Sequence, residues 1–203
     1  MHYFLTGTGT DIGKTYILEQ ICKNWQKNGI HFNAIKPVIS GFNKNDKNSD
    51  LHKILKILGK DFTQENFHEI SLYQFKAPLS PNIAAKKEEK EINYQKVVNF
   101  CQEKIAKFKN ENLIIEGAGG LMSPISDDKT FLDLIKILQI PVILVCGNYL
   151  GTISHSLCAI EILKQHKIPI AKIILNCKKD DKIDYQENLK MLESFSEMKV
   201  LLH

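Results

Sequence analysis

The stretch Gly7-Thr8-Gly9-Thr10-Asp11-Ile12-Gly13-Lys14-Thr15 decides the fold of this chain. It follows a short apolar segment at residues 3–5 and precedes residues 16–26, where apolar side chains recur at helical spacing. A glycine-rich turn between a strand and a helix aims backbone N–H groups and the positive end of the helix at one point, where a polyphosphate can bind. We expect Lys14 to contact the outer phosphates and the Thr15 hydroxyl to bind magnesium. The stretch therefore predicts a phosphate-binding loop.

The spacing of this loop differs by one residue from the common pattern G-x-x-x-x-G-K-[ST]. That pattern requires glycine at position 8, where this chain has Thr8 between Gly7 and Gly9. A turn followed by an ordinary helix start is the alternative interpretation of a G-K-T sequence. The order of strand, glycine-rich loop and helix favours the phosphate-binding loop.

Composition limits the remaining possibilities. The chain has 203 residues, 43% of them hydrophobic, so we expect a single domain over residues 1–203 with one substantial core. Its 27 basic residues are all lysines, which excludes an arginine clamp on phosphate from this chain. The formal net charge is only +4, and Lys86-Lys87 is followed at once by Glu88-Glu89. This mixed pattern argues against a surface for nucleic acid.

The cysteines and the N-terminus indicate a cellular location. Cysteines occur in or beside apolar segments without a C-x-x-C pair or a zinc-like histidine spacing, at Cys22, Cys101, Cys146, Cys158 and Cys177. We expect all five to be reduced core residues. The chain shows no signal-peptide pattern and no apolar run of membrane-spanning length. These observations predict a cytoplasmic protein that makes no membrane contact.

Strand-like and helix-like segments alternate along the chain. Short β-branched runs at residues 32–36, 113–115, 141–145 and 170–175 alternate with helical spacing at residues 51–58, 94–109, 131–138 and 152–166. We expect an irregular stretch after residue 58, continuing to Pro81. This alternation predicts an α/β fold with a mostly parallel central sheet and helices on both faces.

Polar side chains follow several of the predicted strands. Lys36 ends the run at residues 32–36 and Ser40 follows it, Glu116 closes the run Leu113-Ile114-Ile115, and Asn176 follows residues 170–175. Ligands of such folds bind at the carboxyl ends of the strands. Glu116 stands where a Walker B carboxylate would hold magnesium directly or through water. An acidic loop residue before a glycine turn is the alternative for Glu116.

Six segments stand together in an order and spacing that resemble the dethiobiotin synthetase family, and the resemblance covers nearly the whole chain. They are residues 7–15, Lys36-Pro37-Val38-x-Ser40-Gly41, Asn48-Ser49-Asp50, Pro78-x-Ser80-Pro81, Glu116-Gly117-Ala118-Gly119-Gly120 and Leu150-Gly151-Thr152-Ile153. The family's phosphate loop has the same extra residue. The resemblance implies a P-loop NTPase-like fold.

The resemblance also implies the reaction, which is the ATP-dependent closure of a cyclic urea on 7,8-diaminononanoate with CO2 in biotin biosynthesis. Lys36 would stabilise a substrate carbamate, and Lys14 would act with magnesium on the transferring phosphoryl group. Thr10 and Ser40 would donate hydrogen bonds to the carbamate and to that group. The magnesium ligands implied by the resemblance are Thr15, Asp50 and Glu116.

Further contacts follow from the same resemblance. The residues expected to bind the nucleotide are Asp11, Ile12, Gly13, Lys14, Thr15, Tyr16, Glu116, Gly117, Ala118, Gly119 and Asn176. The residues expected to bind the diaminononanoate are Ser40, Leu150, Gly151 and Thr152. A homodimer with a shared active site is implied, in which the helix that begins near Thr152 binds the substrate carboxylate of the partner subunit.

Two segments depart from the family pattern. Asn82 stands where many members have histidine, which puts a catalytic or positioning role for this residue in doubt. Residues 198–203 replace a Gly-x-Ile-Pro segment that lines the base pocket, so the preferred nucleotide base is open.

Other classes of nucleotide-binding protein fit less well. A GTPase would need the N-K-x-D of residues 43–46 after a late strand. A partitioning ATPase would have lysine at the position of Gly9. A small-molecule kinase or an amidating synthetase is the nearest alternative, and the combination of Lys36-Pro37 with residues 48–50 favours the carbamate reaction.

Overall fold

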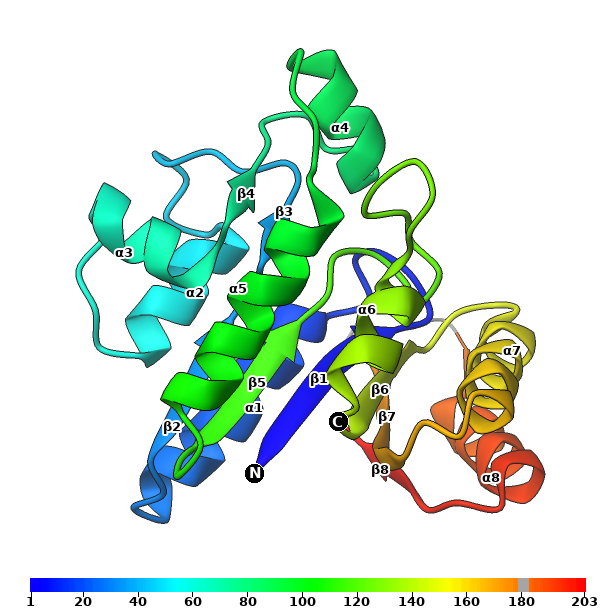
Figure 1. Ribbon diagram of the computed structural model, residues 1–203. Coiled ribbons are helices and arrows are strands. Elements are labelled where there is room, and N and C mark those ends of the chain that lie inside the picture. Colours follow the sequence, from blue (N-terminus) through cyan, green and yellow to red (C-terminus); the bar gives the residue numbers. More distant parts are fainter. Residues whose placement is uncertain (179–182) are drawn as a thin grey trace.

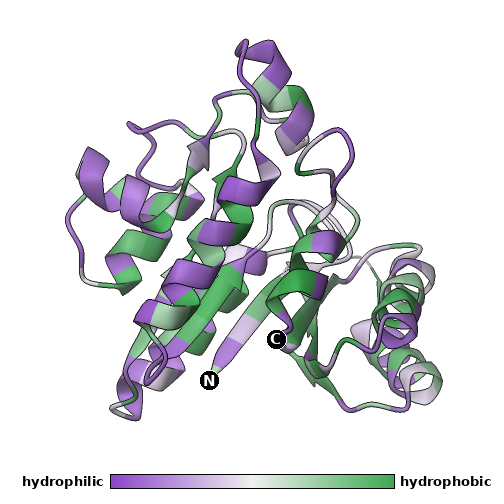
Figure 2. Cartoon of the chain, viewed as in Figure 1, coloured by the Kyte–Doolittle hydropathy of each residue, from purple (hydrophilic) through white to green (hydrophobic). Residues whose placement is uncertain are grey.

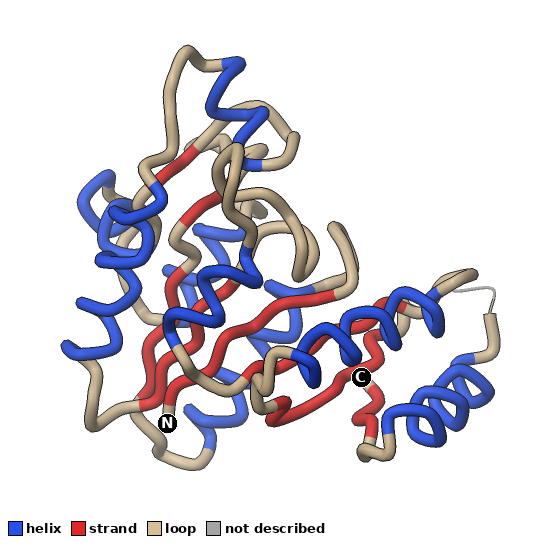
Figure 3. The backbone as a smooth tube through the Cα atoms, turned by 45° about the vertical axis from the view of Figure 1, so that its right-hand side comes forward, coloured by secondary structure: helices blue, strands red, loops and turns tan. Residues whose placement is uncertain are grey.

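The computed structural model describes residues 1–178 and 183–203. Over these residues the main sheet has six strands in the order β2-β5-β1-β6-β7-β8, and every neighbouring pair is parallel (Figures 1 and 3). The strands are β1 (His2–Gly7), β2 (Phe32–Ile35), β5 (Asn112–Glu116), β6 (Val142–Gly147), β7 (Ile170–Asn176) and β8 (Val200–Leu202). The expected parallel α/β fold is confirmed.

Helices cover the sheet. They are α1 (Lys14–Lys27), α2 (Asp50–Ile57), α3 (Gln64–Ile70), α4 (Pro81–Lys87), α5 (Tyr94–Lys107), α6 (Phe131–Leu138), α7 (Thr152–Gln165) and α8 (Tyr185–Ser196). Helix α1 packs on β1, β2 and β5, and in Figure 1 it lies behind the sheet, whereas α5 and α6 pack together in front of it. Helix α7 packs on β6 and on α8, which in turn packs on β8.

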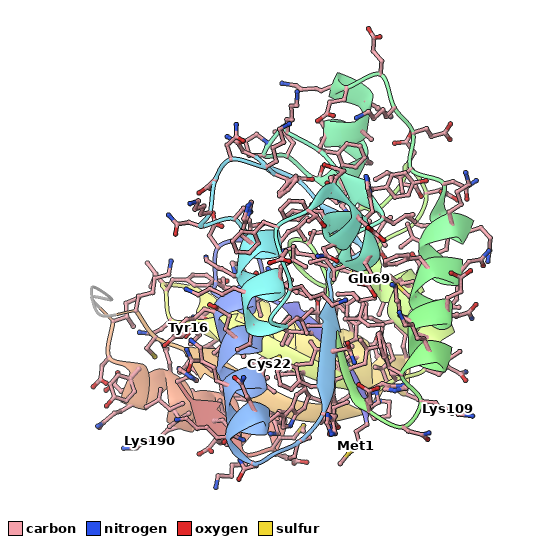
Figure 4. The ribbon with its side chains drawn as sticks, turned by 90° about the vertical axis from the view of Figure 1, so that its left-hand side faces the viewer. Met1, Tyr16, Cys22, Glu69, Lys109 and Lys190 are labelled. Carbon is pink, nitrogen blue, oxygen red and sulfur yellow. The ribbon has the colours of Figure 1, made fainter. Side chains whose placement is uncertain are left out.

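The apolar core lies in the central strands. Every residue of β6 is buried, as expected for a parallel strand covered by helices on both faces. Helix α1 buries Ile17, Leu18 and Cys22 at helical spacing and leaves polar side chains outside. Figure 2 shows this division, with apolar strands inside and mostly polar outer helix faces. In Figure 4, Tyr16 and Cys22 mark the course of α1, which packs beside α2.

Strand register brings the ends of three strands to the same edge. Leu5 of β1 pairs with Glu116 of β5, and Ile35 of β2 pairs with Ile115. Strand β1 therefore ends beside β5, with β2 on the far side of β5. The loops that follow β1, β2 and β5 consequently leave the sheet next to one another, which is the condition for a shared site.

The expected irregular stretch between residue 58 and Pro81 is wrong. It contains α3 and the strand β4 (Tyr73–Gln74), which pairs with β3 (Val38–Ile39) in a separate two-stranded sheet. These elements are short, so they lack the repeated apolar spacing that reveals longer ones. Helix α3 is defined locally, because the Thr63 side chain accepts a hydrogen bond from the Asn66 backbone.

The environment of the cysteines agrees with the sequence only in part. Cys22, Cys101 and Cys146 are buried, whereas Cys158 is exposed on α7 and Cys177 is half-buried. The expectation that all five are core residues is therefore wrong for Cys158. Apolar spacing placed Cys158 on a helix, but it did not reveal which face of α7 the sheet covers.

None of the helices in the described part of the chain is long and apolar enough to cross a membrane.

Candidate active site

A cleft of about 620 Å³ lies over the carboxyl ends of β1, β2 and β5. Its walls come from the phosphate loop, from the segments after β2 and β3, from residues 78–81 and from the segment after β5. All seven of the predicted catalytic and metal-binding residues line it, namely Thr10, Lys14, Thr15, Lys36, Ser40, Asp50 and Glu116. Parallel topology therefore gathers side chains that are about 100 residues apart in the sequence.

The loop between β1 and α1 has the backbone conformation of a tight phosphate-binding turn. Gly13, directly before α1, has a φ of 90°, and an added Cβ there would lie 2.1 Å from Nδ2 of Asn176. Only glycine fits this position without strain. The first N–H groups of α1 have no partners within the helix, so they are available to an anion at this point.

Lys14 folds back over this loop. Its Nζ donates a hydrogen bond to the Gly9 carbonyl at 2.7 Å, and its side chain is buried. Burial, together with the positive charge of Lys36, lowers the pKa of Lys14 to about 8. A polyphosphate in the cleft would favour the charged form and offer Lys14 better acceptors than a single carbonyl.

Lys36 lies between two carboxylates. Its Nζ donates to Oδ2 of Asp50 at 2.5 Å and to Oε1 of Glu116 at 2.7 Å. The Glu116 side chain is fully buried, whereas the Asp50 side chain remains 34% exposed toward the cleft. Burial alone would lower the pKa of Lys36, but the two carboxylates raise it above its ordinary value. Burial alone would raise the pKa of Asp50, and Lys36 outweighs this and lowers it.

The oxygens around Glu116 suit a hard cation. Thr15 Oγ1 donates to Glu116 Oε1 at 2.6 Å, while the buried Oε2 of Glu116 has no hydrogen-bond partner. A buried carboxylate oxygen without a partner is costly unless something occupies it in the working state. The hydroxyl of Thr15 and the carboxylates of Asp50 and Glu116 are donors that Mg²⁺ prefers, and a small set suits a cation that also keeps waters or phosphate oxygens.

Ser40 reaches the same cleft from a different element than expected. It follows β3, which the sequence did not reveal, and its buried Oγ has no hydrogen-bond partner. The structure adds Lys53, Ser80 and Ser123 to the cleft wall. Ser80 carried a signal in the sequence, because it belongs to the segment Pro78-x-Ser80-Pro81, whereas Ser123 carried none. Lys53 lies one turn after Asp50 on α2, so helical spacing from Asp50 could have indicated it.

Asn176 supports the phosphate loop from β7. Its Nδ2 donates to the Ile12 carbonyl at 2.9 Å, and its buried Oδ1 has no partner. Asn176 lines a second hollow of about 370 Å³ beside the loop. Tyr16 lines the main cleft, and its ring meets the ring of His203 edge-on, with centroids 5.2 Å apart.

Comparisons with known proteins identify the family. The family described as AAA domain matches residues 1–203. The ATP-dependent dethiobiotin synthetase BioD of Caulobacter vibrioides is 36% identical over 200 residues, which cover 98% of this chain and 90% of the relative. The protein of the same name from Caulobacter sp. strain K31 is 40% identical over 174 residues, covering 85% and 74%. This chain belongs to the dethiobiotin synthetase family. The predicted family and the predicted class of ATP-dependent synthetase are confirmed.

The fold of this dethiobiotin synthetase family member is also found in solved structures. A ParA family ATPase from Chlorobium tepidum TLS superposes with a TM-score of 0.56 at 14% identity, over 99% of this chain and 81% of that chain. At this identity the likeness concerns the fold alone, and it confirms the expected P-loop NTPase-like architecture.

Residues that the family resemblance assigned to the nucleotide lie on both sides of the loop. Asp11 has a φ of 56° and lines the cleft, as do Ala118 and Gly119. Gly117 is not part of the cleft wall; it packs against the rings of Phe4 and Phe131, and an added Cβ would lie 3.1 Å from Phe4. Its place in the motif is therefore explained by packing under the site.

The segment assigned to the substrate carboxylate lies elsewhere. Leu150, Gly151 and Thr152 do not line the main cleft, and Leu150 is 90% exposed. Thr152 begins α7 and donates from Oγ1 to the Gly147 carbonyl. Asn82 also lies outside the cleft wall, and its Oδ1 accepts a hydrogen bond from Ser80 Oγ.

Proposed function

We propose that this chain is an ATP-dependent dethiobiotin synthetase that forms the ureido ring on 7,8-diaminononanoate from CO2. The observation that carries this proposal is the position of Lys36, whose ammonium contacts Glu116 beside a phosphate-binding loop. The Lys36 ammonium would lie next to the transferring phosphoryl group but outside the phosphate loop. A cation in that position suits a reaction in which an anion, here a carbamate, accepts the phosphoryl group. Membership of the dethiobiotin synthetase family supports the same reaction.

The reaction needs two anions to meet. An amine of the substrate captures CO2 and loses a proton, which gives a carbamate that Lys36 stabilises. A carbamate oxygen attacks the γ-phosphorus of ATP, and the bond from that phosphorus to the β-bridging oxygen breaks with loss of ADP. Lys14 neutralises charge on the phosphoryl oxygens. The second amine then attacks the carbamate carbon, phosphate leaves and the ring closes.

The hydroxyls of the cleft have separate tasks in this proposal. Ser40 Oγ, buried and without a partner, donates to a carbamate oxygen. Thr10 lies in the cleft wall beside Lys14 and donates to the transferring group. A buried hydroxyl that has no partner in the protein gains a full hydrogen bond from a bound substrate, which favours the bound state.

Magnesium fits the oxygen donors around Glu116. Thr15, Asp50 and Glu116 would hold it, and Glu116 Oε2 offers the unused buried oxygen. Such an ion supplies positive charge to the β- and γ-phosphate oxygens. An ion held by Asp50 and Glu116 would take over the neutralisation of these carboxylates, which would leave the Lys36 ammonium available to the carbamate.

We propose further that a homodimer completes the site. Leu150 and Gly151 are exposed at the start of α7, Thr152 is buried beside them, and none of the three lines the cleft of its own chain. A segment that serves the partner subunit would lie in such a position. The first amides of α7 would bind the carboxylate at the far end of the diaminononanoate. The alternative is an ordinary helix start, and sedimentation of the protein with and without substrate separates the two.

The decisive experiment is a phosphate-release assay. We expect release from ATP only when diaminononanoate and bicarbonate are both present; release that ignores this pair would instead indicate a kinase or a switch protein. The variant Lys36→Gln should lose turnover and retain nucleotide binding, because it removes the charge and keeps a polar side chain that is one atom shorter. A parallel loss of nucleotide affinity would show that Lys36 serves phosphate. The same assay with ATP, GTP and CTP measures the base preference.

A further inference from the structure

His52 is a buried polar residue that the proposed reaction does not use. It lies on α2, two residues after Asp50, and its side chain is only 3% exposed. Three phenylalanine rings surround it, with centroid distances of 4.8 Å to Phe62, 4.9 Å to Phe67 and 6.3 Å to Phe42. An apolar side chain would suit these neighbours, so the polar ring needs another explanation.

The partner of His52 is the residue directly before Asp50. Ser49 Oγ and His52 Nδ1 share a hydrogen bond of 2.7 Å. Ser49 is the N-cap of α2, but its side chain accepts no bond from the helix backbone, which is the usual task of a serine at this position. Its hydroxyl is committed to the imidazole ring instead.

The backbone around Ser49 is held as well. The Ser49 N–H donates to the Asp46 carbonyl at 3.0 Å, and the Ser49 carbonyl accepts from the Lys53 N–H at 3.1 Å. The bond to His52 adds the side-chain connection that links this turn to the aromatic cluster. Asp50, the first residue of the helix, is therefore attached to a fixed point in the core on the side away from the cleft.

Asp50 needs such support because its side chain is partly exposed and is attracted to the Lys36 ammonium. Its carboxylate is one-third exposed and is drawn toward the Lys36 ammonium at 2.5 Å. The first turn of a helix has fewer internal hydrogen bonds than its middle, so it frays readily. A small rotation there would displace a carboxylate that must meet Thr15 and Glu116 within the narrow geometry that Mg²⁺ requires.

We propose that His52 is a positioning residue for Asp50, acting through its hydrogen bond to Ser49. The phenylalanine rings hold the imidazole, the imidazole holds the serine hydroxyl, and the serine sets the direction of the first turn of α2. The inference rests on the proposed function in so far as Asp50 is taken to be a magnesium ligand.

The test compares three variants with the wild type. His52→Phe fills the same apolar cage but removes the hydrogen bond, and Ser49→Ala removes it from the other side. His52→Asn keeps a hydrogen-bonding atom the same number of bonds from Cα as Nδ1. The control is Phe62→Leu, which replaces the most exposed of the three rings by another apolar side chain, so that Phe42, Phe67 and the bond to Ser49 still hold the imidazole.

The readout is Mn²⁺ affinity, measured by electron paramagnetic resonance with a non-hydrolysable ATP analogue bound. We expect His52→Phe and Ser49→Ala each to weaken Mn²⁺ binding about tenfold, a loss of about 1.4 kcal/mol, in protein that remains folded at the temperature of the measurement. The double variant should be no weaker than either single variant, because both remove one interaction. His52→Asn should recover most of the affinity, and Phe62→Leu should keep it.

Two outcomes overturn the inference. Unchanged Mn²⁺ affinity in both Ser49→Ala and His52→Phe would show that the bond does not position Asp50. Additive losses in the double variant would show that the residues act separately. If His52→Phe is unstable, Ser49→Ala and His52→Asn still decide the matter. Failure of the proposed function gives a different result. In that case the wild-type protein would bind Mn²⁺ and nucleotide but would release no phosphate with diaminononanoate and bicarbonate.

Discussion

Replacing Lys36 by methionine tests how much the positive charge between the two carboxylates of the cleft contributes to the free energy of unfolding. The change removes one ammonium and leaves two carboxylates, of which Glu116 is fully buried and Asp50 is 34% exposed. Removing one partner of a buried ion pair lowers the free energy of unfolding by about 3–5 kcal/mol. Most of this loss should come from Glu116, since water can still hydrate Asp50. For a chain of this size the melting temperature should fall by roughly 6–20 °C.

The pKa shifts of Asp50 and Lys36 determine how the stability difference between wild type and Lys36→Met depends on pH. The pKa of Asp50 is lowered from 3.8, so its stabilising contribution is present above pH 3.8 and is lost as the pH falls through the lowered pKa. The pKa of Lys36 is raised from 10.5, so its contribution is complete below pH 10.5 and is lost as the pH rises through the raised pKa. The contributions of Asp50 and Lys36 to the stability difference between wild type and Lys36→Met should therefore be constant between these two values. Lys14 adds a change from about pH 8 upward, because Lys36 is one of the causes that lower its pKa to about 8.

Urea denaturation with and without a second change checks the reasoning. The double variant Lys36→Met with Glu116→Gln should recover most of the lost stability, because it removes the charge that has no partner. Lys53→Met is the matched control, since Lys53 lines the same cleft and forms no ion pair within the described residues. A loss below about 1 kcal/mol for Lys36→Met, which is the range of exposed ion pairs, or no recovery in the double variant, would refute the argument.

Three further predictions concern the phosphate loop and a remote helix. Nucleotide binding should take up about one proton at pH 9 and almost none at pH 6.5, because Lys14 has a pKa of about 8 without nucleotide and phosphate favours its charged form. Calorimetry in buffers of different ionisation enthalpy measures the proton uptake. Equal proton uptake at pH 9 and pH 6.5 would contradict the prediction. Gly13→Ala should lower the free energy of unfolding by about 1–3 kcal/mol more than Gly59→Ala, because both glycines have positive φ but only the first Cβ would meet Asn176. Thr130→Ala removes the capping box of α6 and should cost about 1 kcal/mol without changing nucleotide affinity; equal stability of wild type and variant in urea would show that the cap contributes nothing.

The sequence predicted the long elements and the location of the site. Helix α6 begins and ends where apolar spacing predicted a helix, at Phe131–Leu138. Strands β5, β6 and β7 were visible as β-branched runs, and the rule that ligands bind at their carboxyl ends brought Lys36 and Glu116 to one cleft. Long periodic segments are predictable because each residue in them repeats the same environment.

The parts that the sequence did not predict depend on contacts between distant segments. Strands β3 and β4 have two residues each, and they pair across more than 30 positions, so no local pattern reveals them. The pairing of Lys36 with Asp50 and Glu116 requires three loops to meet. His52 resembled any polar residue on an amphipathic helix until the phenylalanine rings around it were in place. The magnesium ligands, the substrate contacts of residues 150–152 and the dimer remain predictions.

The environment of Lys14 distinguishes its reactivity from that of an ordinary lysine in the described part of the chain. At pH 7 an amine with a pKa of about 8 is neutral in roughly one molecule in ten, whereas an ordinary lysine is neutral in roughly one in three thousand. An acylating or aldehyde reagent small enough to enter the cleft should therefore label Lys14 first, while the carboxylates that hold the proton on Lys36 keep it inert. Without bound nucleotide, the enzyme would then be open to selective covalent inhibition at Lys14. Bound nucleotide would protect Lys14 from the reagent.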